Sequence, residues 1–190
     1  MNSLAQARTL GGIGSILILL AIIPIAGGVL FIVGLIMVLI AVKYISENVE
    51  DKTIFNNMLI AVILVIVGMI AGFAVAIAGK MFPFFGEFRP LYGPSMFMEP
   101  RMYPFFITFI IALVIVWVFC IGSAIFLRKS YTTVASKLNI SMFGTVALLY
   151  LIGAILAIIF VGFVVIYVAE ILQTVAFFSI VEKPQQPLQA

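Results

Sequence analysis

The chain has no histidine and a single cysteine, Cys120, among its 190 residues. Without histidine it can build neither a His-based general base nor a His/Cys zinc site, and one cysteine forms neither an internal disulfide nor a CxxC redox pair. Serines are present, but no lysine lies within an apolar segment where it could activate one as a nucleophile. We therefore expect no enzymatic activity, no cofactor and no metal site.

Charged residues are also scarce, at 9% of the chain, whereas 65% of the residues are hydrophobic and the mean hydropathy is +1.36. Four long runs carry no charge: residues 9–42, 53–79, 102–127 and 138–169, the last continued by 171–181. A helix needs ~20 residues to span ~30 Å of hydrocarbon, so the middle two runs are single helices and the outer two must each fold back once. The sequence predicts an all-α, multi-pass bundle of about six membrane-embedded helices in the cell membrane.

The first run has an obvious turn at residues 24–28, where Pro24 removes a backbone donor and Gly27 and Gly28 weaken a continuing helix. The first helix then covers residues 4–23. Only about 14 apolar residues follow Arg8, or ~21 Å, so a shallow hairpin that does not cross the membrane is an alternative. In the last run we place the turn at residues 153–156, because two helices must fit into the available length.

An internal repeat would agree with this division. Val33 and Gly34 are followed seven residues later by Ala41, as Val161 and Gly162 are by Ala169, and Gly14 and Gly144 open the preceding segments. The two hairpins would then run in the same direction, unlike the inverted halves of many transporters. Chance similarity between apolar segments is the alternative explanation.

Lysine and arginine counting predicts the orientation. With both termini in the cytoplasm, seven of the ten basic residues lie inside and three outside, as the positive-inside rule requires. The sequon at Asn139 should then stay unglycosylated. Residues 1–181 form one membrane domain with an outer loop at 80–104, and 182–190 form a polar tail that we expect to be disordered.

Glu170 is the one charged residue inside an apolar run, and Gln173 and Thr174 follow at helical spacing, so the three form one polar stripe. A carboxylate in hydrocarbon costs at least ~2.5 kcal/mol, which favours a face toward protein or water. The stripe predicts a proton or cation site or a contact to a partner. Alternatively, Glu170 lies near the inner interface and reaches the headgroups.

Two further features could mediate contacts. Gly68, Gly72 and Ala76 form a small-residue stripe of the GxxxG kind, suited to close helix packing within the bundle or, less favoured, with a partner. The outer loop is rich in proline and aromatic residues that suit the headgroup layer or a protein interface. Its candidate contact residues are Phe82, Phe84, Phe85, Phe88, Arg89, Tyr92, Phe97, Arg101 and Tyr103.

The whole-chain pattern resembles a family of small archaeal multi-pass membrane proteins known only as a domain of unknown function (number 996). The resemblance rests on residues 7–15 (ARTLGGIGS), 23–24, 27–28, 33–36, 43–46, 151–155 and 176–180. It does not extend to the outer loop. Membership implies an archaeal cell membrane but no activity and no catalytic residue.

Taken together, these features favour a non-enzymatic accessory or scaffolding subunit of a membrane complex. Its expected partners are the lipid bilayer and another membrane protein or a second copy of the chain, and not a nucleic acid. The alternative is a small transporter or channel whose path is lined by Glu170, Gln173 and Thr174. Substitution of Glu170 by glutamine should separate them, because a permeation site loses flux with the assembly intact, whereas an interface loses the assembly.

Overall fold

The computed structural model describes residues 3–78 and 102–181. For residues 102–105 it describes the backbone but not the side chains. Within these ranges all regular secondary structure is helical, and six helices are long and apolar enough to cross a membrane, which confirms the predicted fold class. The elements are α1 (Ser3–Leu19), η1 (Leu20–Ile22), α2 (Gly27–Asn48), α3 (Lys52–Ala78), α5 (Met102–Leu138), α6 (Ser141–Leu156), η2 (Ala157–Ile159) and α7 (Val161–Phe178).

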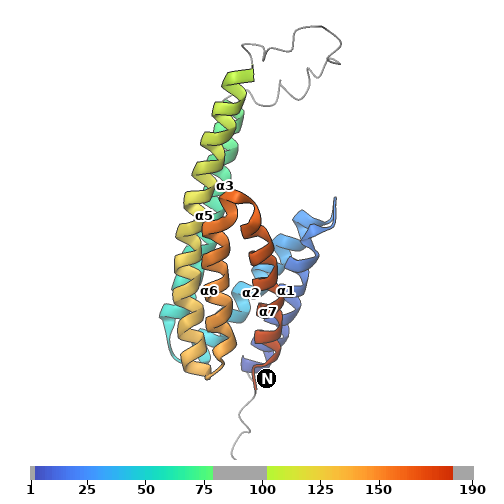
Figure 1. Ribbon diagram of the computed structural model, residues 1–190. Coiled ribbons are helices and arrows are strands. Elements are labelled where there is room, and N and C mark those ends of the chain that lie inside the picture. The colour runs from blue at the N-terminus through green and yellow to red at the C-terminus, as the bar shows by residue number, and fades with distance from the viewer. Residues whose placement is uncertain (1–2, 79–101, 182–190) are drawn as a thin grey trace, which may run out of the picture.

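The helices form three antiparallel pairs that stand side by side: α1 with α2, α3 with α5, and α6 with α7 (Figure 1). Helices α1 and α7 also pack together, so the first and last helices of the described chain lie side by side. The start of α1, the end of α7 and the α2–α3 and α5–α6 connections all lie at one end of the bundle. We refer to it as the polar end, because these connections carry Glu50, Asp51 and Asn139. That it faces the cytoplasm stays a prediction.

The first turn lies where the sequence predicts it, since η1 ends at Ile22 and α2 begins at Gly27. The second turn lies later in the chain than the predicted residues 153–156. Helix α6 runs through Gly153 to Leu156, and the chain reverses only after η2, at Phe160. Gly153 serves helix packing and not a turn. Its lack of a side chain allows α7 to approach closely, since a Cβ on Gly153 would lie 3.1 Å from the Gly162 carbonyl oxygen.

The internal repeat gains structural support, with one correction. A Cβ on Gly14 would lie 2.8 Å from the Gly34 carbonyl oxygen, which is the same arrangement that Gly153 and Gly162 make in the second hairpin. Both hairpins, α1–α2 and α6–α7, therefore close through a glycine contact between their two helices. The predicted equivalence of Gly14 with Gly144 is wrong, because Gly144 faces Ala135 of α5 instead.

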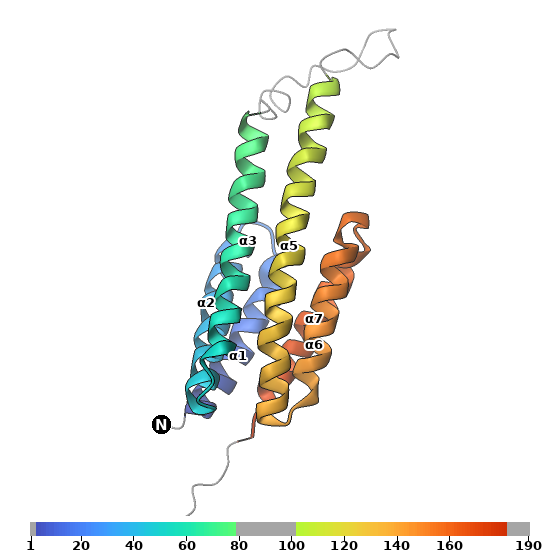
Figure 2. The same ribbon diagram turned by 90° about the vertical axis from the view of Figure 1, so that its left-hand side faces the viewer.

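The third pair, α3 with α5, is longer than the other two and extends well beyond their turns at the end opposite to the polar end (Figure 2). Helices α3 and α5 have 27 and 37 residues, whereas α6 has 16. In their most apolar windows only 17% of the residues of α3 and α5 are buried, compared with 28% in each of the other four helices. The molecule is thus a bundle of six helices, from one end of which two of them, α3 and α5, project as a hairpin.

Candidate functional site

A buried glutamine lies at the centre of the half of the bundle that is nearer the polar end, which we refer to as the polar half. The Gln173 side chain, 2% exposed, uses all four of its hydrogen-bonding positions. Its Oε1 accepts hydrogen bonds from the hydroxyls of Tyr131 at 2.8 Å and Tyr150 at 3.0 Å. Its Nε2 donates to Ser15 Oγ at 2.8 Å and to Glu170 Oε2 at 3.3 Å. We refer to these five residues as the Gln173 network.

The Gln173 network joins four of the six helices. Ser15 comes from α1, Tyr131 from α5, Tyr150 from α6, and Gln173 from α7. Ser15 and Tyr131 are completely buried, and Tyr150 is 9% exposed. Each helix is tied to the same amide, so a shift of any one of them along its axis would break a bond inside a region that holds little water. The network therefore fixes the relative register of the helices.

The three residues of the predicted polar stripe take different places. Gln173 is the centre of the network, and Glu170 is half-buried at its edge. Thr174 does not join, because its hydroxyl donates to the Glu170 carbonyl of its own helix at 3.0 Å. Two residues of the predicted stripe thus belong to the Gln173 network, whereas the hydroxyl of the third, Thr174, forms its hydrogen bond within α7.

Beneath the network lies an aromatic cluster of Tyr131, Phe143 and Phe177, all fully buried. The rings meet edge to face, with centroids 5.5 Å apart for Tyr131 and Phe143 and 5.2 Å apart for Phe143 and Phe177. Such geometry adds ~0.5–1.5 kcal/mol per pair beyond the burial of apolar area. Tyr131 belongs to both clusters, so its ring stabilises the packing that holds its hydroxyl toward Gln173.

Two glycines explain how α1 approaches α7 closely enough for Ser15 to reach the network. Side chains at Gly11 and Gly12 would collide with the rings of Phe177 and Phe178. The segments 7–15 and 176–180, on which the family resemblance rests, therefore pack against each other. Close helix contact through small residues is a main route to association in lipid.

Sequence reasoning missed Ser15, Tyr131 and Tyr150. Each lies in a different helix from Gln173, and no local pattern links residues 158 positions apart. One signal was available for Ser15, since it ends the glycine-rich stretch that opens the chain. The tyrosines gave none, because this residue type is also typical of membrane interfaces.

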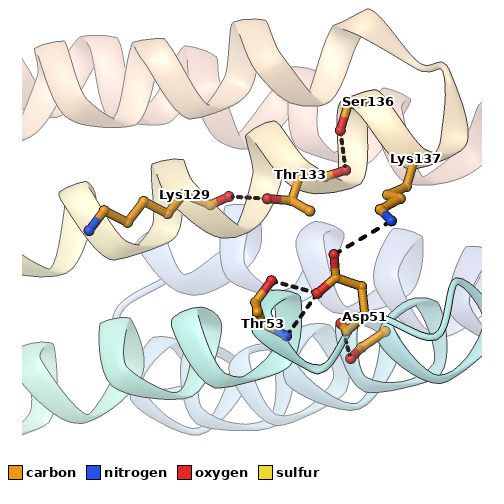
Figure 3. Close-up of polar contacts among 7 residues, drawn as sticks. Asp51, Thr53, Lys129, Thr133, Ser136 and Lys137 are labelled. Atoms are coloured by element: carbon orange, nitrogen blue, oxygen red, sulfur yellow. Dashed lines mark hydrogen bonds and ion pairs between the residues drawn. The ribbon is translucent and has the colours of Figure 1, made fainter.

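A second group of polar contacts connects α3 and α5 at the polar end (Figure 3). Asp51 Oδ1 accepts hydrogen bonds from the Thr53 backbone N–H at 3.0 Å and from its hydroxyl at 2.6 Å, so Asp51 caps the start of α3. Lys137 Nζ lies 3.8 Å from Asp51 Oδ2. The bonds from Thr53, and to a lesser degree Lys137, hold the pKa of Asp51 below its ordinary value.

An open groove of about 560 Å³ lies against α5 a little farther from the polar end. Asn57, Arg128, Lys129, Thr132 and Thr133 contribute its polar lining. Arg128 and Lys129 are both exposed, and Lys129 Nζ lies 5.1 Å from the centre of the Phe126 ring. Their position marks the level at which α5 changes from uncharged to basic.

The predicted small-residue stripe on α3 packs inside the chain. Gly68 and Gly72 are buried, and a Cβ on Gly68 would lie 2.5 Å from Phe119 Cβ, while one on Gly72 would collide with Val116. Ala76 is half-buried farther along the same helix. The predicted contact residues of the outer loop, from Phe82 to Arg101, lie outside the described residues, and the Tyr103 side chain is not described either.

Chemically, the described residues offer a saturated hydrogen-bond network rather than a reactive pair. They contain no group of three or more histidine, cysteine, aspartate or glutamate side chains able to hold a metal ion, and none of their buried side-chain nitrogen or oxygen atoms lacks a hydrogen-bond partner. The arrangement is typical of a structural centre.

Comparison with known proteins identifies the family. Residues 30–171 match the model of a family described as "Protein of unknown function (DUF996)". A relative from Methanocaldococcus jannaschii, named "Uncharacterized protein MJ1644", is 34% identical over 179 residues, which cover 93% of each chain. No solved structure matches the chain. The resemblance noted from the sequence is thereby confirmed, and the chain belongs to this family of proteins of unknown function.

Proposed function

We propose that the chain is a non-enzymatic integral membrane protein that acts as an accessory or scaffolding subunit, associating laterally with another membrane protein or with a second copy of itself. One observation carries this proposal: the projecting part of the α3–α5 hairpin has no other helix of the described chain beside it. Two helices alone leave most of their surface to be covered by lipid or by a partner.

The surface available for a partner is not the glycine stripe. Because Gly68 and Gly72 are occupied by α5, a partner must contact the outward faces of the hairpin. On α3 these faces include Ile70, 64% exposed, and on α5 they include Ile107 and Ile110, each 58% exposed. Long apolar side chains gain little by leaving lipid for protein, so the proposed contact depends on shape complementarity.

The first test is gentle extraction of the tagged protein from its native membrane, followed by native mass measurement. The proposal predicts either a stoichiometric membrane-protein companion or a defined homo-oligomer. Photo-crosslinking residues placed at Ile70 and Ile110 should then capture that partner. A matched residue at Ile171, 44% exposed on α7 of the short bundle, should capture it much less. A monomer that crosslinks only to lipid at all three positions would contradict the proposal.

The second candidate is a transporter or channel, and the position of Glu170 favours it. This carboxylate is half-buried and bonded to the network, so it joins the centre of the bundle to its surface. Against it, all hydrogen-bonding positions of Gln173 are occupied and Thr174 bonds its own helix. Conversion of Glu170 to glutamine should abolish flux with the assembly intact if the residue lines a path. Unchanged assembly together with unchanged flux would show that Glu170 has neither a role in association with a partner nor a role in transport.

A further inference from the structure

The two short hairpins and the long hairpin differ in length, although each of their helices is long enough on its own to span a bilayer. Helix α5 ends at Leu138 and α6 begins at Ser141, so the two helices share their level at the polar end. At ~1.5 Å per residue, the 37 residues of α5 extend over ~55 Å, whereas the 19 residues of α6 and η2 extend over only ~28 Å. A hydrocarbon layer of ~30 Å can therefore be placed in two ways.

In the first placement the layer covers the short hairpins completely. Arg128 and Lys129 begin the last eleven residues of α5, ~16 Å from its end, so both exposed side chains would lie near the middle of the hydrocarbon. The projecting part of α3–α5, with Ile70 and Ile110 exposed, would stand in water. Charge in lipid and a large apolar surface in water are both unfavourable, so this placement fails twice.

In the second placement the headgroups lie at the level of Arg128 and Lys129. The uncharged part of α5, residues 102–127, is then ~39 Å long and crosses the layer with room for tilt. Glu170, near the middle of α7, comes to lie close to the same interface. The short hairpins start below this level and their turns end inside the hydrocarbon, short of the far side.

The turns themselves have the composition of a hydrocarbon environment. Residues 16–42, which include the whole α1–α2 turn, contain no polar side chain, and neither do residues 151–166 around the α6–α7 turn. The side chains at the two tips are nevertheless exposed on the molecule: Ile25 fully, and Phe160 by 69%. A turn that emerges into water would be expected to carry polar residues.

The backbone of the four turns strengthens this comparison. Each has one residue with positive φ: Glu50 at 55° and Asn139 at 57° at the polar end, Ile25 at 73° and Phe160 at 63° at the apolar tips. Asparagine adopts this conformation easily, whereas a β-branched isoleucine does so only under strain. The tips thus keep large apolar side chains at positions where glycine or asparagine would be easier, which fits turns immersed in lipid.

Several polar backbone groups near the tips have hydrogen-bond partners within the chain. The Gly27 N–H donates to the Ile23 carbonyl at 2.8 Å, and the Phe163 N–H donates to the Phe160 carbonyl at 3.1 Å. Two carbonyls in the last turn of α6, at Ala154 and Ile155, accept from the indole N–H of Trp117 at 3.0 and 3.2 Å. Internal partners of this kind are required where backbone lies in hydrocarbon.

We infer that α1–α2 and α6–α7 are re-entrant hairpins: both enter the membrane from the polar end and turn back within the hydrocarbon, where lipid acyl chains cover their tips. Only α3 and α5 cross the bilayer. Both hairpins close through the same kind of glycine contact between their two helices. We therefore assign both of them the same re-entrant position in the membrane.

The test measures the depth of the four turns in the full-length protein reconstituted into lipid vesicles. In a background with Cys120 replaced by alanine, single cysteines at Ile25 and Phe160 carry a nitroxide label. Glu50 and Asn139 provide matched controls, because they have the same backbone conformation at the other end. Labels at Ile63, Val67 and Ile70, all exposed on α3, calibrate depth. Collisions with oxygen and with a water-soluble nickel chelate are then compared by electron paramagnetic resonance.

We expect the labels at Ile25 and Phe160 to collide with oxygen several-fold more than with nickel, as labels within the α3 calibration series do, and the control labels to show the reverse. Nickel collisions at both tips equal to those at Glu50 would overturn the inference. Exclusion of both reagents would also overturn it, because protein rather than lipid would then cover the tips. If either variant fails to fold, cysteines at Ile22 and Ile159 report on the same turns.

Discussion

The polar half of the bundle and the projecting part of α3–α5 are made of similar apolar residues but are held together by different forces. In the polar half, one buried amide bonds side chains from three other helices and lies above a cluster of three aromatic rings. Farther from the polar end, α3 and α5 meet through glycines and apolar side chains, at Gly68 with Phe119 and at Gly72 with Val116. The comparison shows that a hydrogen-bond network can specify register where many helices meet, whereas glycines allow the close packing of a single pair.

The strongest test of this difference is replacement of Gln173 by leucine. The change removes four hydrogen bonds and leaves two buried tyrosine hydroxyls and Ser15 without their partner, so we expect a loss of about 2–4 kcal/mol in the free energy of unfolding. Reversible unfolding in mixed detergent micelles measures it. The neighbouring Thr174→Val variant is the control and should lose much less, since its hydroxyl bonds only its own helix. Equal losses in the two variants would show that the network contributes nothing special.

The glycines of the long hairpin provide the second test. Gly68→Ala should cost about 1–3 kcal/mol, because its new Cβ would lie 2.5 Å from Phe119 Cβ and would force α3 and α5 apart. Gly28→Ala is the matched control, since nothing lies within 4 Å of that position, and it should be neutral or slightly stabilising. The same unfolding assay ranks the two variants. Retained stability in Gly68→Ala would mean that the hairpin tolerates a wider spacing.

The contact between the two regions should have a smaller effect. Trp117→Phe keeps most of the ring but removes the N–H that bonds the Ala154 and Ile155 carbonyls, so we expect a loss of about 1 kcal/mol. Amide hydrogen exchange should increase in α6 and η2 and stay unchanged in α2. A uniform increase over all helices would contradict a local role of Trp117.

The sequence predicted the fold class and the first turn well, because these depend on apolar length and on Pro24, which are local signals. The second turn was misplaced, since Gly153 suggested a break although its missing side chain serves the contact with Gly162. The site was predicted in part: Glu170 and Gln173 stood out as polar residues in an apolar run. Their partners on α1, α5 and α6 depend on tertiary packing, which no spacing along the chain reveals.

The smallest effect should come from the cap on α3, outside the apolar core. The pKa of Asp51 is lowered in the folded protein, chiefly by its bonds from Thr53, so the ionised carboxylate stabilises the fold. This contribution is fully present above the unfolded value of 3.8 and is lost as the pH falls through the lower folded value. The wild-type protein should therefore lose a little more stability than Asp51→Asn when the pH is lowered from 5 toward 3, and the two Tm curves should converge. Parallel Tm curves would show that the hydrogen bonds from Thr53 do not lower the pKa of Asp51 in the folded protein.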